Sequence, residues 1–232
     1  MDTINCIKTV ILGESSTGKT SITYRLARDK FNEHMESTIG ASFMTKYYDD
    51  IKYSIWDTAG QEKYLALVPL YYRNSNLLLL VFDMSNPTTM NRFTYYLDKI
   101  IIDLDTEYKI LIIGNKCDLV KSDMVKKRID HEIRQKLAKY DTLKNKIDYV
   151  YISTKTGENF EELIDKIKQN GKELTKLKSA SYVIDKNTIR ITPDHFHNQP
   201  GNNNSNDNSN GNSFISTNIL NPLKSGTEYC YC

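Results

Sequence analysis

Short apolar runs alternate with amphipathic stretches along roughly the first 175 residues. Three of the apolar runs are typical of strands covered on both faces, and they occupy residues 77–82, 110–113 and 149–152. A further strand is predicted over residues 4–12, where the apolar run has polar interruptions. Two further runs, at residues 41–48 and 52–56, are rich in strand-forming side chains and are separated by two aspartates. This arrangement predicts a hairpin.

The amphipathic stretches between these runs each place their apolar side chains on one helical face. The three predicted faces consist of Phe93, Leu97, Ile100, Ile101 and Leu104; Ile129, Ile133, Leu137 and Tyr140; and Phe160, Leu163, Ile164 and Ile167. Strands that alternate with helices predict a mostly parallel sheet with helices on both of its faces. Ligands of such sheets bind at the carboxyl ends of the strands, so we expect the chemistry in the loops that follow them.

The composition changes after Gly171. Residues 198–213 are almost entirely Asn, Ser, Gly and Asp, and they lack the aliphatic and aromatic side chains needed to offset the entropy of ordering. We therefore expect one folded domain over residues 1–175 and a flexible tail over residues 176–232. A weak anchoring patch is expected within the tail, around residues 214–223.

Bulk properties exclude several classes of protein. The chain has 232 residues and a net charge of +2, which gives no reason to expect nucleic-acid binding through overall electrostatics. It begins without the basic and apolar stretches of a signal peptide, and its longest apolar run, residues 77–82, is far too short to cross a bilayer. Cys6 and Cys117 lie in or beside apolar runs, so we expect reduced thiols and a cytosolic setting.

The clearest chemical motif is at residues 13–20, which read GESSTGKT and match the phosphate-binding pattern G-x-x-x-x-G-K-[ST]. A strand is predicted before it and a helix after it, which is the context that the pattern requires. Backbone N–H groups in such a loop point at phosphate oxygens, Lys19 can reach the outer phosphates, and Thr20 can bind Mg²⁺. The predicted nucleotide contacts here are Gly13, Glu14, Ser15, Ser16, Thr17, Gly18, Lys19, Thr20 and Ser21.

The loop after residues 110–113 carries groups suited to guanine. The Asp118 carboxylate can accept hydrogen bonds from N1–H and the 2-amino group of guanine, a pair of donors that adenine does not offer. Guanine should then be strongly preferred over adenine, because the wrong base leaves a buried polar group unpaired. Asn115 can bridge the base and the phosphate-binding motif, and the stem of Lys116 can lie along the base.

A second base-binding loop is predicted after residues 149–152, where Ser153, Thr154 and Lys155 follow the strand. The backbone N–H of Thr154 could meet guanine O6. Each of these loops is common by itself. Their order, each directly after a predicted strand, makes them informative together.

The loop after residues 52–56 supplies the groups for metal binding and hydrolysis. Asp57 is placed to hold Mg²⁺ through water, and Thr38 offers a second hydroxyl. Gly60 can offer its N–H to the γ-phosphate because it has no Cβ in the way. Gln61 can orient the attacking water. The predicted metal ligands are thus Thr20, Thr38 and Asp57, and the predicted catalytic residues are Gln61 and Lys19.

Over about residues 5–170 the chain resembles the small Ras-like GTPases, and within them the Rab family. The Rab-like segments are IGASF at 39–43, KYSIWD at 52–57, QEKY at 61–64 and YYR at 71–73. The resemblance implies the P-loop NTPase fold: a three-layer α/β sandwich with a mostly parallel six-stranded sheet, one antiparallel edge strand and about five helices. It also implies that Phe31 packs edge-on against the guanine. Four residues are implied to face effectors, namely Ile39 and the aromatic triad of Phe43, Trp56 and Tyr71.

The segments 13–15 and 36–41 are similar to the early-endosomal branch of Rab proteins. Three features depart from the family pattern. Thr154 replaces a usual alanine, and Ser15 stands where some relatives have glycine near the γ-phosphate, which leaves the intrinsic hydrolysis rate open. The Asn-rich tail is longer and less basic than many Rab tails, so its targeting role is not carried over.

The chain ends Cys230-Tyr231-Cys232, which is not a C-a-a-X box. It resembles the C-x-C ending of Rab proteins, which receives two geranylgeranyl groups. Two prenyl chains give stable membrane attachment where one is marginal.

The resemblance implies a GTPase that switches between GTP and GDP forms, with Mg²⁺, and regulates vesicular traffic, with endocytic traffic as the expected pathway. It would act on the cytoplasmic face of an intracellular membrane such as the early endosome, with a soluble cytosolic pool in the GDP form. The implied partners are an exchange factor, a GTPase-activating protein, a GDP-dissociation inhibitor, a prenylation escort protein and effectors.

Four other classes of protein fit the sequence less well. A nucleotide-locked scaffold with negligible turnover would lack one of Thr20, Thr38, Asp57 or Gln61, and all four are present. Asp118 and the 153–155 loop disfavour a P-loop ATPase or nucleotide kinase. The terminal cysteines disfavour a nuclear-transport GTPase, and the C-terminal sequence and the lack of a helical insert after residue 119 disfavour a Rho-type protein.

Overall fold

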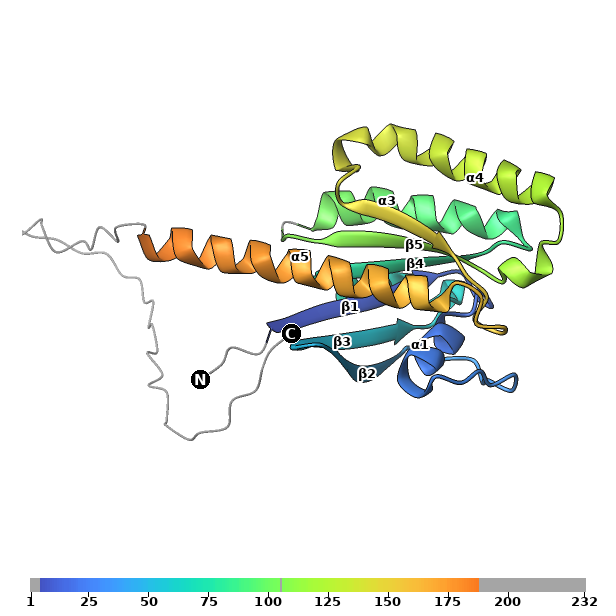
Figure 1. Ribbon diagram of the computed structural model, residues 1–232, viewed down its shortest axis with the longest axis horizontal. Helices are drawn as coiled ribbons and strands as arrows, with labels where there is room; N and C mark the ends of the chain where they lie inside the picture. The colour runs from blue at the N-terminus through green and yellow to red at the C-terminus, as the bar shows by residue number, and fades with distance from the viewer. Residues whose placement is uncertain (1–4, 105, 188–232) are drawn as a thin grey trace, which may run out of the picture. The chain divides into compact units, whose positions relative to one another are not determined.

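The computed structural model describes residues 5–104 and 106–187 (Figure 1). Its strands are β1 (Asn5–Gly13), β2 (Ala41–Tyr48), β3 (Ile51–Thr58), β4 (Leu77–Asp83), β5 (Lys109–Asn115) and β6 (Ile147–Tyr151). Its α-helices are α1 (Lys19–Arg28), α2 (Val68–Tyr72), α3 (Met90–Asp103), α4 (Asp123–Leu137) and α5 (Phe160–Asn187). Its 3₁₀ helices are η1 (Glu62–Leu67), η2 (Pro87–Thr89), η3 (Cys117–Leu119) and η4 (Ala138–Leu143).

The strands form one sheet in the order β2-β3-β1-β4-β5-β6. Only the pairing of β2 with β3 is antiparallel, and the other four pairings are parallel. The predicted hairpin is therefore present, and Tyr48 faces Ile51 across its two-residue turn. This topology confirms the predicted fold: a mostly parallel six-stranded sheet with an antiparallel edge strand and five α-helices.

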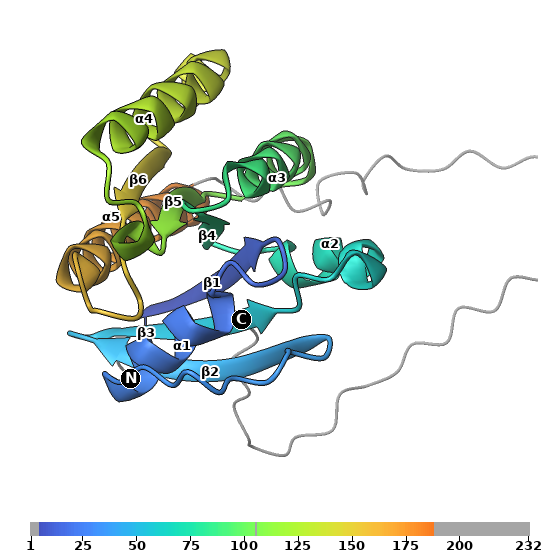
Figure 2. The ribbon, with the colours of Figure 1, turned by 90° about the vertical axis from the view of Figure 1, so that its right-hand side faces the viewer.

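Helices cover both faces of the sheet, as Figure 2 shows, with α1 and α5 on one face and α2, α3 and α4 on the other. Successive residues of a strand point to opposite faces. In β1, Ile7 and Ile11 accordingly join the core beneath α1 and α5, whereas Val10 and Leu12 join the core beneath the other helices. All seven residues of β4 are buried, which explains its unbroken apolar run.

The second predicted helical face is correct only in part. Ile129 and Ile133 are buried in α4 as expected, but the α-helix ends at Leu137. Tyr140 lies beyond it in η4, where its backbone is not helical, and its hydroxyl donates to Asp98 of α3 at 2.6 Å. The side chain therefore reaches a neighbouring helix instead of continuing the α4 face.

The last helix passes through the predicted domain boundary. Leu174 of α5 is fully buried, and the helix continues to Asn187. The boundary at residue 175 thus falls inside α5 and stays a prediction. The predicted Asn-rich tract, the patch at 214–223, Cys230 and Cys232 lie outside the described residues.

Two further observations concern the cysteines and the membrane. Cys117 is a buried free thiol, as predicted. The sulfur of Cys6 lies 3.6 Å from the Ser54 hydroxyl, and its reduced state stays a prediction. In the part of the chain that the structure describes, no helix is both long enough and apolar enough to cross a bilayer.

Candidate nucleotide-binding site

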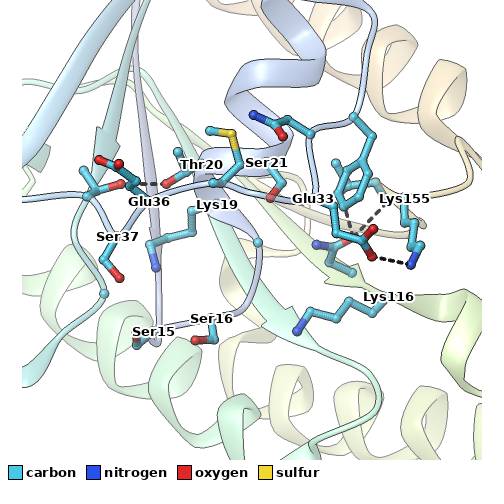
Figure 3. A pocket seen from close by; sticks show the side chains of 18 of the residues that line it. Ser15, Ser16, Lys19, Thr20, Ser21, Glu33, Glu36, Ser37, Lys116 and Lys155 are labelled. Carbon is cyan, nitrogen blue, oxygen red and sulfur yellow. Dashed lines mark hydrogen bonds and ion pairs between the residues drawn. The ribbon is translucent and has the colours of Figure 1, made fainter.

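A pocket of about 380 Å³ lies at the carboxyl ends of the strands (Figure 3), where ligands of parallel sheets bind. Its walls come from the phosphate loop (residues 13–20), from residues 29–40 between α1 and β2, and from the loops after β3, β5 and β6. The volume is within the ~300–1,000 Å³ of typical small-molecule sites. In Figure 3, Thr20 lies toward one end of the pocket and the Glu33–Lys155 ion pair toward the other.

Most of the predicted site residues line this pocket. They are Ser15, Ser16, Gly18, Lys19, Thr20, Ser21, Phe31, Thr38, Gly60, Gln61, Asn115, Lys116, Asp118, Thr154 and Lys155. The others support the wall from behind. The carbonyl of Glu14 accepts hydrogen bonds from the Thr17 hydroxyl at 2.9 Å and from Lys19 at 2.8 Å. Gly13 ends β1, and Ser153 is fully buried with its hydroxyl accepting from the Thr156 N–H at 3.0 Å.

Lys19 is the principal cation of the phosphate loop. It is 5% exposed, and its ammonium group meets the Glu14 carbonyl. Burial lowers the pKa of Lys19 to about 8, against the opposing charges of Asp57 and Glu14. A bound phosphate would supply the anion that a buried ammonium group requires.

Gly60 lies against the phosphate loop. A Cβ at this position would come within 2.3 Å of Lys19 Nζ and 2.6 Å of the Ser15 backbone nitrogen. Contacts this short leave no room for a side chain at residue 60. The backbone of the loop after β3 therefore lies directly against the ammonium group of Lys19. Gln61 follows directly and lines the same wall.

The three predicted metal ligands, Thr20, Thr38 and Asp57, lie together at the phosphate end of the pocket. The hydroxyls of Thr20 and Thr38 are 2.7 Å apart, and Thr38 donates to Asp57 Oδ2 at 3.4 Å. Asp57 is fully buried, and within the described residues its Oδ1 has no hydrogen-bond partner. Burial raises the pKa of Asp57, opposed by hydrogen bonds from Thr20, Thr38 and Ser42 and by the charge of Lys19.

This donor set fits Mg²⁺. Hard oxygen ligands, few protein donors and room for water are what this ion requires. An unpaired buried carboxylate oxygen is also unfavourable unless a cation or a water molecule completes its shell.

At the opposite end of the pocket, Asn115 connects three loops. Its amide donates to the carbonyl of Thr17 at 2.9 Å, and its Oδ1 accepts from both the N–H and the hydroxyl of Thr154, at 3.1 and 2.8 Å. We expected the Thr154 N–H to be directed at the base, but here it is directed at Asn115. Because Thr154 stands where the family usually has alanine, its hydroxyl adds one hydrogen bond, to Asn115, to this network.

Lys116 and Asp118 complete the base end. Lys116 adopts a left-handed backbone conformation, and its ammonium group lies 2.7 Å from Asp83 Oδ2. Burial opposes ionisation of Asp83, yet hydrogen bonds from Lys116 and Ser85 hold the pKa of its carboxyl below the usual value. Within the described residues, Asp118 Oδ1 is a buried acceptor without a donor.

Sequence reasoning missed several residues of this site. Asp83 ends β4 and orients Lys116, and an acid at the end of a buried strand was the available signal. Glu33 was also missed. Its carboxylate pairs with Lys155 across the mouth of the pocket at 2.9 Å. Arg25 of α1 donates to the Thr154 carbonyl at 2.8 Å, and no motif pointed to it.

The four residues predicted to face effectors lie on one surface beside the pocket. Ile39 and Phe43 are 83% and 54% exposed, which is unusual for such apolar side chains. The ring of Trp56 lies between those of Phe43 and Tyr71, with centroid distances of 5.2 and 6.3 Å. The structure thus brings the predicted triad into one aromatic row.

Known proteins share this arrangement of motifs. A model described as the Ras family matches residues 8–173, which include every loop of the pocket. The chain is 37% identical over 166 residues to the GTP-binding protein YPT53 of Saccharomyces cerevisiae, covering 68% of this chain and 72% of the yeast protein. It is 34% identical over 165 residues to the GTP-binding protein ypt5 of Schizosaccharomyces pombe, covering 69% of this chain and 75% of that protein.

Proposed function

The chain belongs to the Ras family as a Rab small GTPase of membrane trafficking, and on that premise we propose that it is a prenylated GTP/GDP switch of the endocytic pathway. The pocket residues described above would hold the nucleotide. Hydrolysis of GTP to GDP and phosphate would end each cycle.

One observation carries the assignment of the pocket. Two of the buried side-chain oxygens left without a partner in the described residues are Asp57 Oδ1 and Asp118 Oδ1. Asp57 is the carboxylate predicted to hold the metal, and Asp118 is the carboxylate predicted to bind the base. A nucleotide with its metal would satisfy both.

At the base end, Asp118 would accept from N1–H and the 2-amino group of guanine. Asn115 would hold the loops of Thr17 and Thr154 together around the base, and Lys116, oriented by Asp83, would lie along its plane. Phe31, which lines the same pocket, would cover the edge of the guanine. Ser153 would shape the loop, and the backbone N–H of Lys155 would face O6.

At the phosphate end, the N–H groups of the phosphate loop and the Lys19 ammonium group would bind the phosphates. Thr20, Thr38 and Asp57 would hold Mg²⁺, Asp57 through water. When bound, the ion neutralises phosphate charge and stabilises the charge that develops as the γ-phosphoryl group is transferred.

For hydrolysis, Gln61 would orient the attacking water and the Gly60 N–H would bind a γ-phosphate oxygen. Residues 32–40 contain no arginine that could stabilise the developing charge. Intrinsic turnover should therefore be slow, on the order of 10⁻⁴–10⁻³ s⁻¹, and depend on an activating protein in trans.

Loss of the γ-phosphate would remove ligand contacts from Thr38 and Gly60, so both loops would relax. Effectors would bind the row formed by Phe43, Trp56 and Tyr71 only while these loops are ordered. An exchange factor, a GDP-dissociation inhibitor and a prenylation escort protein are the remaining family partners we propose.

Membrane attachment would come from two prenyl groups on Cys230 and Cys232, and the membrane would be the early endosome. Intact mass spectrometry of the reduced protein from cells should show both groups. Replacing both cysteines with serine should move the protein to the soluble fraction. Persistent pelleting of that variant would contradict the anchor, and absence from early compartments loaded with a fluid-phase tracer would contradict the pathway.

The pocket assignment is tested by Asp118→Asn. The amide should weaken GDP binding by about 10²–10⁴-fold, because each of two charge-assisted hydrogen bonds contributes ~1.5–3 kcal/mol. Binding of xanthosine diphosphate should improve, because its 2-oxo group can accept from the new amide. Unchanged GDP affinity in a displacement assay would refute the assignment of the base site.

A further inference from the structure

Arg25 joins α1 to the base loop, which we define as residues 153–157. Its Nη1 donates to the carbonyl of Thr154 at 2.8 Å and to that of Lys155 at 3.5 Å. Its guanidinium carbon lies 5.2 Å from the centroid of the Phe160 ring, at the start of α5. One side chain thus contacts the base loop and the helix that follows it.

The base loop is shaped around this guanidinium group. Gly157 has a φ of +89°, a left-handed conformation that side chains rarely adopt, and a Cβ there would lie 2.5 Å from Arg25 Nη2. Within the described residues, Arg25 Nε is buried without a partner. Burying that donor costs free energy, so the contacts to the carbonyls and to Phe160 must offset it.

These contacts orient the peptide group between Thr154 and Lys155. In a trans peptide the C=O and N–H point in opposite directions, so a Thr154 carbonyl that faces Arg25 turns the Lys155 N–H away from it. In the part of the chain that the structure describes, no backbone carbonyl accepts from this N–H, and Lys155 lines the pocket. The N–H is therefore available to a ligand.

We propose that Arg25 is a positioning residue for guanine recognition, which holds the base loop so that the backbone N–H of Lys155 faces O6 of the bound base. The inference rests on the proposed nucleotide function. Lys19 and Thr20 begin the same helix, so α1 would connect the group that binds phosphate with the loop that reads the base. The base loop would then be held in place from the phosphate side of the pocket.

The test compares Arg25→Ala with Arg28→Ala, which removes the same charge from an exposed position on the same helix. Dissociation constants are measured for GDP, for 6-thio-GDP, which weakens only the O6 acceptor, and for IDP, which lacks only the 2-amino group. Arg25→Ala should weaken GDP and IDP by about 10-fold, in line with one charge-assisted hydrogen bond. It should weaken 6-thio-GDP by less than about 2-fold, because two changes that remove the same contact are not additive.

Arg28→Ala should leave all three constants unchanged. Equal weakening of all three nucleotides by Arg25→Ala would show a merely structural role and overturn the proposal, as would no weakening at all. If Arg25→Ala does not fold, Arg25→Gln keeps an N–H donor and should give the same pattern at reduced size. Failure of the proposed function is distinguishable, because the wild-type protein would then not prefer GDP to 6-thio-GDP and IDP.

Discussion

The two ends of the pocket are built differently. At the base end, most polar groups are already bonded to one another: Asn115 bonds to Thr17 and Thr154, Lys116 bonds to Asp83, and Arg25 bonds to the base loop. Asp118 Oδ1 is the base-end acceptor left for the ligand within the described residues. At the metal end, the hydroxyls of Thr20 and Thr38 are 2.7 Å apart, but the hydrogen bond from Thr38 to Asp57 is long, at 3.4 Å, and Asp57 Oδ1 has no partner in the described residues. Most of the base end is therefore preorganised, whereas the metal end depends more on its ligands.

This difference suits a switch. A part that must hold either nucleotide gains affinity from being fixed beforehand, because binding then costs little ordering entropy. A part that must distinguish GTP from GDP has to change with the ligand, so its contacts in the free protein should be few. Four substitutions test the comparison.

The largest effect is expected at the base end from Asn115→Ala. The change removes three hydrogen bonds, so the nucleotide-free protein should lose about 2–4 kcal/mol of unfolding free energy, at ~0.5–1.5 kcal/mol per bond. GDP affinity should fall by about 10³-fold, because the base loop loses its link to the phosphate loop. Denaturant titration and displacement of a fluorescent nucleotide measure the two effects.

Asn159→Gly is the control for Asn115→Ala, because glycine accepts the left-handed backbone of Asn159, whose φ is +56°. Asn159 donates one exposed hydrogen bond to the Tyr151 carbonyl at 2.9 Å and does not line the pocket. It should change nucleotide affinity by less than about 2-fold, as is usual for surface sites. Equal losses in the two variants would contradict a preorganised base end.

At the metal end, Thr38→Ala should have the opposite profile. Unfolding free energy of the free protein should fall by no more than about 1.5 kcal/mol, because this hydroxyl makes one short hydrogen bond, to Thr20 at 2.7 Å, and one long one, to Asp57 at 3.4 Å. Affinity for GTP should fall about 10-fold with Mg²⁺ present, while affinity for GDP should change little.

Thr38→Ser keeps the hydroxyl and should retain most of the GTP affinity. A magnesium titration of both variants separates loss of a ligand from loss of packing. Equal weakening of GTP and GDP by Thr38→Ala would contradict a role of this residue in sensing the γ-phosphate.

A smaller effect is expected from Asp83→Asn, which removes the charge that orients Lys116. GDP should dissociate about 5- to 10-fold faster, since a charge-assisted hydrogen bond to a pocket residue is weakened. Stopped-flow release of a fluorescent nucleotide gives the rate. Asp98→Asn, at a surface acid bonded to Tyr140, should leave the rate unchanged, and the same acceleration in both variants would point to general destabilisation.

The smallest effect is expected from Glu33→Gln. Glu33 and Lys155 are 68% and 58% exposed, so their pairing is screened by water and salt. Release of GDP should become about 2-fold faster at low ionic strength, and the difference should vanish at high salt. Glu36→Gln, at another exposed acid of the pocket rim, should show no such salt dependence, and a difference that persists in high salt would exclude an electrostatic cause.

Much of this protein could be predicted from its sequence. The apolar runs marked the strands because a strand covered on both faces is apolar along most of its length, as β4 is up to Phe82. The phosphate loop, the base-binding motifs and the loop of Asp57 each follow a strand. A parallel sheet gathers such loops at one edge, which is why local motifs were enough to predict a common pocket.

Only the tertiary structure decided how the pocket is supported. Arg25 and Thr154 are 129 positions apart, and Asn115 and Thr17 are 98 apart, so no local pattern links them. The order of the strands, and the packing of α1 and α5 on the same face of the sheet, decide which turn of α1 meets the base loop. The direction of the Thr154 N–H toward Asn115 depends in the same way on two loops meeting in space. A sequence specifies periodicity and local chemistry directly, whereas contacts between distant side chains exist only once the sheet has set their distances.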